Sequence, residues 1–203
     1  MKIDNFNQII KYIDNKDKQS TTFFLVQIIQ RSKDNPSLSK NKVIRSFWIS
    51  DSAKLKSQKK DIITFCEAFN ARCYFFVNKR DSTNIASLLS KKCIDIITSN
   101  EYVNINRELN SITASNHSEP RLNQRYIIDI DTKDDEIINK YEDLLDKTYE
   151  ERKRKIDYFI LNTINGVHII ANVFDLKLFY TYCDVEKIEK PTVFTDNCTL
   201  LYA

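Results

Sequence analysis

The stretch Asp157–Phe174, DYFILNTINGVHIIANVF, decides how the second half of this chain folds. Two apolar runs, 157–163 and 167–174, flank the dipeptide Asn165-Gly166. Asn-Gly between two such runs predicts a β-hairpin, because a type I′ turn requires positive φ at both central residues. Gly166 is the only glycine among 203 residues, so we expect it where the backbone demands a glycine.

The segments around this hairpin predict a β-α-β-β-α-β order. They are a strand at 125–131 (RYIIDID), a helix from residue 132 or 134 to about 152, a helix at 175–182 capped by Asp175, and a closing strand at 199–202. This order is that of the split βαβ, or ferredoxin-like, unit. Nucleotide-polymerising palms and RNA-recognition modules share it, so the fold alone does not choose between them.

The first hundred residues predict a second unit of strands and helices. Apolar runs indicate strands at 21–30, 43–49 and 72–77, and helical spacing indicates helices at about 51–70 and 81–98. The polar segment 99–124 reads as a loop or lid with one short helix. We therefore expect an α/β (α+β) fold in one domain, residues 1–203. An N-terminal α/β lobe (20–98) would pack on a C-terminal RRM-like, palm-like lobe (125–203).

Composition narrows the functional classes. The formal net charge is +3 and the pI about 8.5, which permits nucleic-acid binding without arguing for it. The five cysteines form no C-x-x-C pair, which argues against zinc and fits the reduced thiols of a cytoplasmic protein. No signal peptide is apparent, and no run approaches the roughly 18 apolar residues of a membrane span. The glycine-rich patterns of P-loop and Rossmann phosphate sites are absent.

Two carboxylates mark the end of the strand at 125–131. Asp129 and Asp131 are two residues apart, so on a strand both side chains project from one face. Neighbouring carboxylates repel each other, and a divalent cation such as Mg²⁺ or Mn²⁺ relieves that repulsion. The alternative is a solvated strand end in which these acids help to cap the following helix.

Three further groups are candidates for the same site. His168 follows Gly166 by two residues, on the hairpin expected beside the Asp strand, where it would bind a triphosphate or position a reacting group. The alternative is an ordinary half-buried histidine. Asp196 precedes the closing strand as a possible third acid, with Asp184 and Glu186 as competitors and a plain loop acid as the alternative. Lys79 and Arg80 end a strand of the first lobe, where they would grip phosphates.

Asp129-Ile130-Asp131 behind an apolar strand, followed by Asn165-Gly166-Val167-His168 on a hairpin, resembles the archaeo-eukaryotic primase superfamily. The core of that family has a D-x-D or D-x-E motif, then a small-x-His motif, then a further acid. The chain also looks like small proteins of this pattern found in phages. The resemblance is specific for about residues 125–203.

The resemblance implies a set of roles. Asp129 and Asp131 would bind Mg²⁺ or Mn²⁺, with Asp196 as the third acid, although its surroundings do not closely match the family's third motif. His168 would contact the phosphates of the incoming nucleotide, with Asn165 beside it. The implied partners are nucleoside triphosphates, a single-stranded DNA template and a helicase or other replication protein, in the cytoplasm of a bacterial or phage-infected cell.

The sequence thus predicts a primase or primase-polymerase core. Two alternatives stay open: a catalytically inactive nucleotide- or nucleic-acid-binding accessory factor on the same fold, and a metal-dependent nuclease that uses the same carboxylates.

Overall fold

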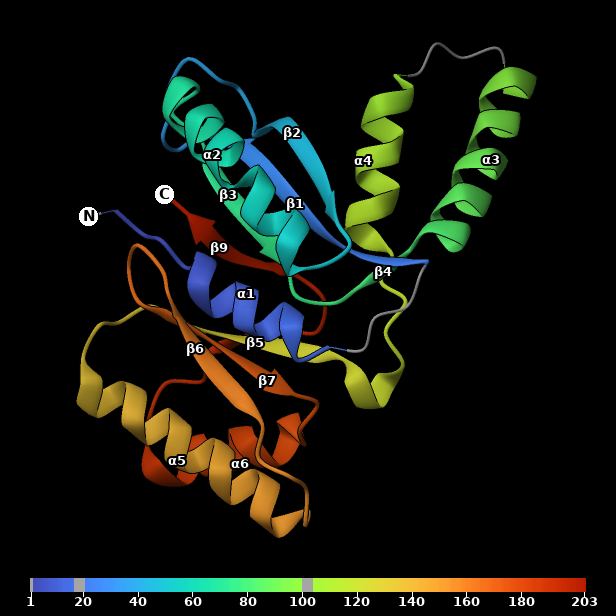
Figure 1. The fold of residues 1–203 in the computed structure, drawn as a ribbon. Coiled ribbons are helices and arrows are strands. Elements are labelled where there is room, and N and C mark those ends of the chain that lie inside the picture. Colours follow the sequence, from blue (N-terminus) through green and yellow to red (C-terminus); the bar gives the residue numbers. More distant parts are fainter. Residues whose placement is uncertain (1, 17–20, 100–103) are drawn as a thin grey trace.

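The computed structural model describes residues 2–16, 21–99 and 104–203, and shows a mixed α/β protein with two antiparallel sheets (Figure 1). This agrees with the expected α+β class. The elements are α1 (Phe6–Asp14), β1 (Thr22–Gln30), β2 (Lys42–Ile49), α2 (Ser52–Ala68), β3 (Arg72–Phe76), β4 (Arg80–Asp81), α3 (Ser82–Ser99), α4 (Ile105–Ser115), η1 (Arg121–Asn123), β5 (Arg125–Ile130), α5 (Asp135–Glu151), β6 (Tyr158–Asn162), β7 (Val167–Asn172), α6 (Leu176–Glu186), β8 (Thr192–Phe194) and β9 (Cys198–Tyr202).

The first sheet has the strand order β2-β1-β3-β9, with β4 pairing to β1. The helix α2 begins as expected, because the Asp51 side chain caps it by accepting from the backbone N–H of Lys54. The helix α1 was not predicted. It buries four hydrophobic side chains at helical spacing, Phe6, Ile9, Tyr12 and Ile13.

The second sheet has the strand order β6-β7-β5-β8, and all neighbouring strands are antiparallel. Three of its strands and both helices lie where the sequence predicted them. The fourth strand does not: it is β8, whereas the expected closing strand at 199–202 is β9 and pairs with β3 of the first sheet. The four residues 199–202 of β9 are buried, so this strand is stable only inside the protein, in the first sheet. The strand β8, in contrast, is short and partly exposed and follows Pro191, as is usual for an edge strand.

The hairpin of β6 and β7 is confirmed, but its predicted type I′ turn is wrong. No glycine has positive φ, and Asn165 is not among the described positive-φ residues. The turn spans residues 163–166, and the backbone N–H of Thr163 donates to the carbonyl of Gly166 at 2.8 Å. Glycine is required here for another reason: a Cβ at Gly166 would lie 1.9 Å from the carbonyl oxygen of Ile130.

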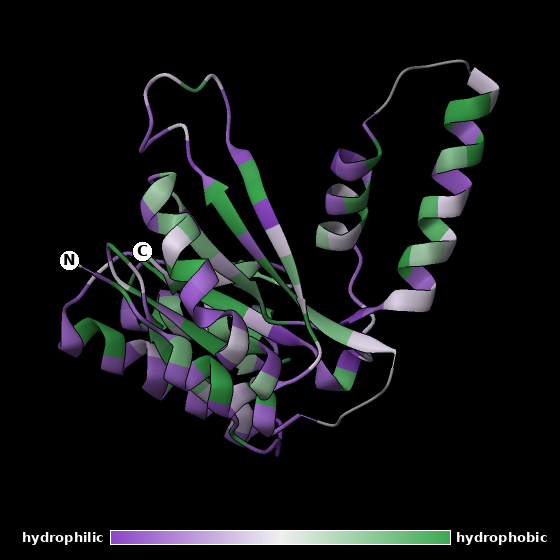
Figure 2. Ribbon diagram, turned by 45° about the horizontal axis from the view of Figure 1, so that its top comes forward, coloured by the Kyte–Doolittle hydropathy of each residue, from purple (hydrophilic) through white to green (hydrophobic). Residues whose placement is uncertain are grey.

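The two sheets share one hydrophobic core. Phe24 and Phe75 of the first sheet belong to the same buried cluster as Ile127, Leu161 and Ile170 of the second. A second cluster fills the space between the other face of the second sheet and the helices α5 and α6. In Figure 2 hydrophobic and hydrophilic residues alternate along the helices, so each helix has a hydrophobic side to pack with. The second sheet is therefore covered on both faces, and its strand ends are the places left for a site.

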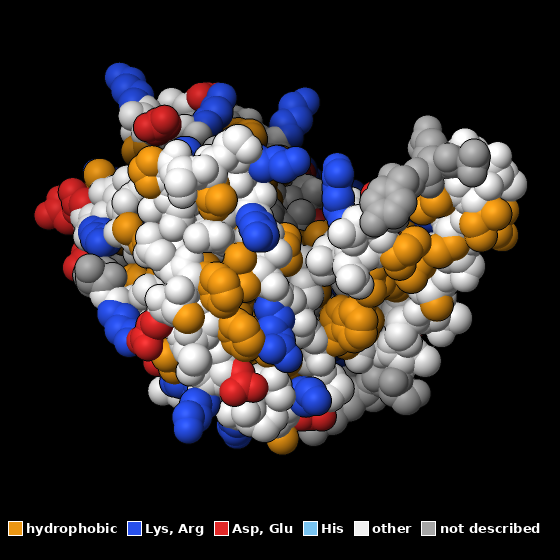
Figure 3. All heavy atoms as spheres, turned by 90° about the horizontal axis from the view of Figure 1, so that it is seen from above, with side chains coloured by type: hydrophobic (Ala, Val, Ile, Leu, Met, Phe, Trp, Pro, Cys, Tyr) orange, Lys and Arg blue, Asp and Glu red, His pale blue; other side chains and the backbone are white. Residues whose placement is uncertain are grey.

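The polar segment 99–124 is more structured than expected. Residues 100–103 lie outside the described residues; the rest contains α4 and η1. The helices α3 and α4 form an arm beside the first sheet (Figure 1), and α4 is attached to that sheet by a 2.7 Å hydrogen bond from Ser46 to Asn110. Hydrophobic side chains gather along the arm (Figure 3), and Ile94 and Ile97 of α3 are exposed.

In the described parts of the chain, no helix is both long and apolar enough to cross a lipid bilayer.

Candidate functional site: a carboxylate and histidine pair between the sheets

Asp129 and His168 lie side by side on neighbouring strands of the second sheet. They are register partners in the antiparallel pair β5 and β7, and the Nε2 atom of His168 lies 3.2 Å from Oδ1 of Asp129. Alternate residues of β5 face opposite sides of the sheet: Ile128 packs toward α5 and α6, whereas Ile127 belongs to the core shared with the first sheet. The Asp129–His168 pair therefore lies on the face that looks toward the first sheet.

The other ring nitrogen of His168 reaches the first sheet. Its Nδ1 is 2.9 Å from the hydroxyl of Thr199, a fully buried residue of β9. Nε2 thus faces a carboxylate, which accepts hydrogen bonds when it is ionised, and Nδ1 faces a hydroxyl, which can donate or accept one. Both nitrogens of His168 are thus engaged within the protein, and the ring holds the Asp129 carboxylate in place.

Asp131 follows β5 by one residue and is exposed. Asp129 and Asp131 line the same cavity of about 440 Å³, which also carries Lys140 and Lys190. The hairpin turn that contains Asn165 lies beside this end of β5, because Gly166 packs against the backbone of Ile130 and Thr132. The structure therefore brings together Asp129, Asp131, His168 and the turn of Asn165.

The donor set can be compared with the needs of a metal ion. Among the residues that the structure describes, no group of three or more His, Cys, Asp and Glu side chains is placed to hold a metal. Mg²⁺ is nevertheless bound in many proteins by one or two carboxylates, with waters and substrate phosphates in the other positions. Two carboxylates beside an open cavity fit that kind of site, in which the substrate completes the coordination.

Asp196 does not join these acids. In the pairing of β5 with β8, Thr192 lies opposite Asp129 and Phe194 opposite Ile127, so the chain continues toward Arg125, the other end of β5. The expectation that Asp196 is the third acid is therefore corrected. It depended on placing the closing strand in the second sheet, and that strand belongs to the first.

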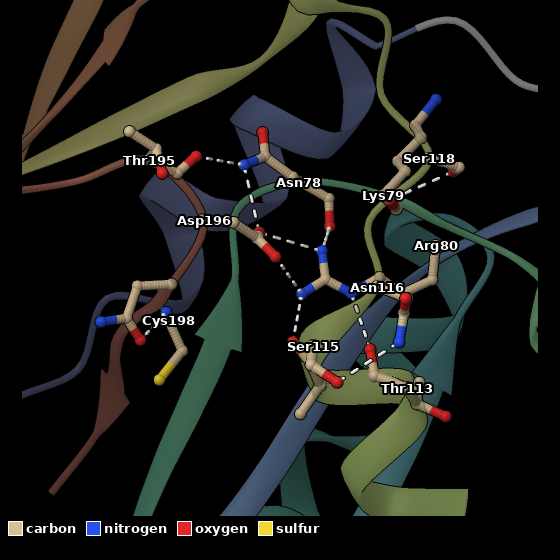
Figure 4. A network of polar contacts seen from close by, with 12 residues as sticks. Asn78, Lys79, Arg80, Thr113, Ser115, Asn116, Ser118, Thr195, Asp196 and Cys198 are labelled. Carbon is tan, nitrogen blue, oxygen red and sulfur yellow. Dashed lines mark hydrogen bonds and ion pairs between the residues drawn. The ribbon is translucent and has the colours of Figure 1, made fainter.

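Arg80 holds Asp196 instead, in a buried network (Figure 4). The Arg80 side chain is fully buried, and its Nη2 lies 3.2 Å from the carboxylate of Asp196. Its nitrogens also donate to the carbonyls of Thr113, Ala114 and Asn78 at 2.9, 2.9 and 2.7 Å. Burial lowers the pKa of Arg80, and the charge of Asp196 opposes that shift. The predicted phosphate-gripping role of Arg80 is corrected: its guanidinium joins α4 to the residues after β8.

Lys79 also lies away from the carboxylates. It lines a second cavity, of about 590 Å³, that includes Arg125 at the start of β5, and its ammonium sits 5.7 Å from the ring centre of Phe24. Thr199, by contrast, was not predicted as a site residue. No local pattern marks it, because its role arises only when β9 packs beside the second sheet.

Comparisons with protein-family models, with curated proteins and with solved structures found no match to this chain. The resemblance to the archaeo-eukaryotic primase superfamily, which is specific for about residues 125–203 and looser for residues 20–98, therefore stays a prediction.

Proposed function

We propose that this protein is a metal-dependent nucleotidyltransferase of the primase-polymerase type. In this proposal the second sheet with α5 and α6 serves as the palm-like lobe, and the first sheet with its helices as the N-terminal lobe. One observation carries it: Asp129 is paired with His168 at the end of β5, and the same cavity carries Asp131. The substrates would be nucleoside triphosphates on a single-stranded DNA template, with a helicase or other replication protein as partner.

The side chains of the site have separable roles in this proposal. Asp129 and Asp131 would hold Mg²⁺ or Mn²⁺, which when bound would polarise the attacking 3′-hydroxyl and offset the charge of the leaving pyrophosphate. His168 keeps the Asp129 carboxylate oriented, in place of the phosphate contact expected from the sequence, because both of its ring nitrogens face protein groups. Lys140 stands at the same cavity and offers positive charge to the triphosphate. Lys190, in contrast, is paired with Asp184 at 2.7 Å, and Glu189 lines the same wall.

The test is nucleotide incorporation on a single-stranded DNA template with Mg²⁺ or Mn²⁺. We expect template-dependent products from the wild type and none above background from Asp129→Asn/Asp131→Asn. The matched control is Asp143→Asn, which neutralises an exposed carboxylate of α5 and should leave synthesis unchanged. Absence of synthesis by the wild type, in tubes where a control primase is active, would refute the proposal.

A second candidate is a nucleotide- or nucleic-acid-binding factor without synthetic activity. The ion pair of Asp196 with Arg80 favours it, because the expected third acid is engaged elsewhere. Binding that persists in Asp129→Asn/Asp131→Asn, with no synthesis by the wild type, would support this candidate. Degradation of a labelled strand without added nucleotides would instead identify a nuclease that uses the same carboxylates.

A further inference from the structure

The larger of the two cavities described above lies at the opposite end of β5 from the carboxylates. It has a volume of about 590 Å³ and is bounded by α1, β6 and the segment that leads into β5. No residue lines both this cavity and the cavity of Asp129 and Asp131. Its volume is in the range that holds small organic ligands.

The charge of this cavity favours an anion. Four cationic side chains line it against two carboxylates: the cations are Lys11, Lys16, Lys79 and Arg125, and the acids are Glu119 and Asp157. Asp157 is already paired with Arg125 at 2.5 Å. Burial and the charge of Arg125 lower the pKa of Lys16, and Lys79 adds to this effect. An anion among these groups would relieve the crowding of positive charge.

Two buried polar atoms of the same cavity wall have no hydrogen-bond partner among the described residues. They are Nε of Arg125, whose residue is 7% exposed, and Oε1 of Glu119. Buried polar atoms of native proteins are nearly always paired, so two orphans in one wall point to a polar ligand.

Aromatic rings form another part of the wall. The rings of Tyr12 and Phe159 lie 5.2 Å apart at an angle of 33°, and the guanidinium of Arg125 is 5.8 Å from the centre of the Tyr12 ring. Together with Tyr158, these rings give the cavity an apolar surface beside its cations. A ligand that matches both parts carries an aromatic ring and an anionic group.

We propose that this cavity binds a nucleoside phosphate at a second site, separate from the metal-dependent one. The phosphates would lie among Lys16, Lys79 and Arg125, and the base against the partly exposed rings of Tyr158 and Phe159. This site requires no metal, because the positive charge is supplied by the protein. It does not depend on the proposed catalytic function.

The test is equilibrium binding of AMP, ATP, adenosine and pyrophosphate, measured by calorimetry in buffer with EDTA. We expect saturable binding of AMP and ATP to the wild type, with adenosine and pyrophosphate each weaker because each lacks one half of the ligand. Lys16→Gln/Lys79→Gln should weaken AMP binding by about tenfold or more, because two charge-assisted contacts are lost. Phe159→Leu is a second, independent variant that should weaken AMP but not pyrophosphate.

Two controls separate this proposal from the catalytic one. Lys140→Gln/Lys190→Gln removes the same charge from the other cavity, and Asp129→Asn/Asp131→Asn removes the metal carboxylates; both should bind AMP as the wild type does. Thermal melts check that each variant is folded. Adenosine binding as tight as AMP, or AMP binding unchanged in Lys16→Gln/Lys79→Gln, would overturn the proposal. So would an absence of saturable binding at about 1 mM ligand.

Discussion

Gly166→Ala should destabilise the protein through a single close contact. The added Cβ would meet the Ile130 carbonyl oxygen at 1.9 Å and the Thr132 nitrogen at 2.6 Å, and both are backbone atoms that cannot rotate away. Real Cβ contacts stay above 3.0 Å, so the turn and the end of β5 must separate by about 1 Å. Overpacking of this kind costs about 1–3 kcal/mol, or more where the backbone is pinned. For a chain of this size that corresponds to a fall in Tm of about 2–12 °C.

The assay is thermal unfolding followed by circular dichroism, with Asn165→Ala as the control. Asn165 is the neighbouring exposed residue of the same turn, so its replacement should change stability by less than about 0.5 kcal/mol. The displaced backbone includes Asp131, so Gly166→Ala should also reduce nucleotide incorporation at temperatures where it is fully folded. If Gly166→Ala melted at the wild-type temperature, the close approach of the turn to β5 would be wrong, and with it the reason given for the glycine.

Three further predictions concern buried groups. Arg80→Met should lower the free energy of unfolding by about 3–5 kcal/mol in urea titrations, because it leaves a carboxylate and three carbonyls without their buried partner. Thr199→Val should cost about 1–2 kcal/mol and reduce incorporation in the folded protein, since His168 loses the hydroxyl that orients it; unchanged incorporation would exclude a positioning role. Burial raises the pKa of the Cys183 thiol to about 11, so at pH 8.5 the buried Cys183 should stay a thiol and alkylate far more slowly than the half-exposed Cys93, as followed by mass spectrometry.

The sequence was sufficient to predict the strands and helices that are set by the pattern of their own residues. The strands β5, β6 and β7 are runs of mostly apolar residues between polar segments, and α5 repeats its hydrophobic residues at helical spacing. These patterns place Asp129 beside His168 without knowledge of any distant contact. That juxtaposition is the part of the candidate site that could be predicted.

The closing strand could not be assigned in the same way. Its residues, CTLLY, form a better strand pattern than the TVF of β8, so local pattern favours β9 as the fourth strand of the second sheet. The sheet to which β9 belongs is decided by contacts with residues far away in the sequence. The strand β9 pairs with β3, and Ala203 exchanges backbone hydrogen bonds with Ile3 at 2.7 and 3.1 Å. The N-terminal segment before α1 is therefore part of the reason why the chain returns to the first sheet.

The burial of Arg80 also could not be predicted from the sequence. In the sequence Asn78-Lys79-Arg80 all three side chains are polar, and nothing local separates a surface cation from a buried one. The structure buries Asn78 and Arg80 completely while Lys79 is left at a cavity wall. The difference comes from α4, whose last carbonyls accept from Arg80, and that helix begins more than twenty residues later in the chain.

The return of β9 to the first sheet also bears on how the candidate site works. Thr199 belongs to the first sheet, whereas His168 and Asp129 belong to the second. The chain of contacts from hydroxyl to imidazole to carboxylate therefore exists only while the two sheets are packed together. Any movement that separates them removes the hydrogen bond on Nδ1, and the ring that holds the carboxylate then loses its second anchor. The orientation of the Asp129 carboxylate consequently depends on the packing of the two sheets. Only the carboxylate and the histidine could be recognised as site residues from the sequence.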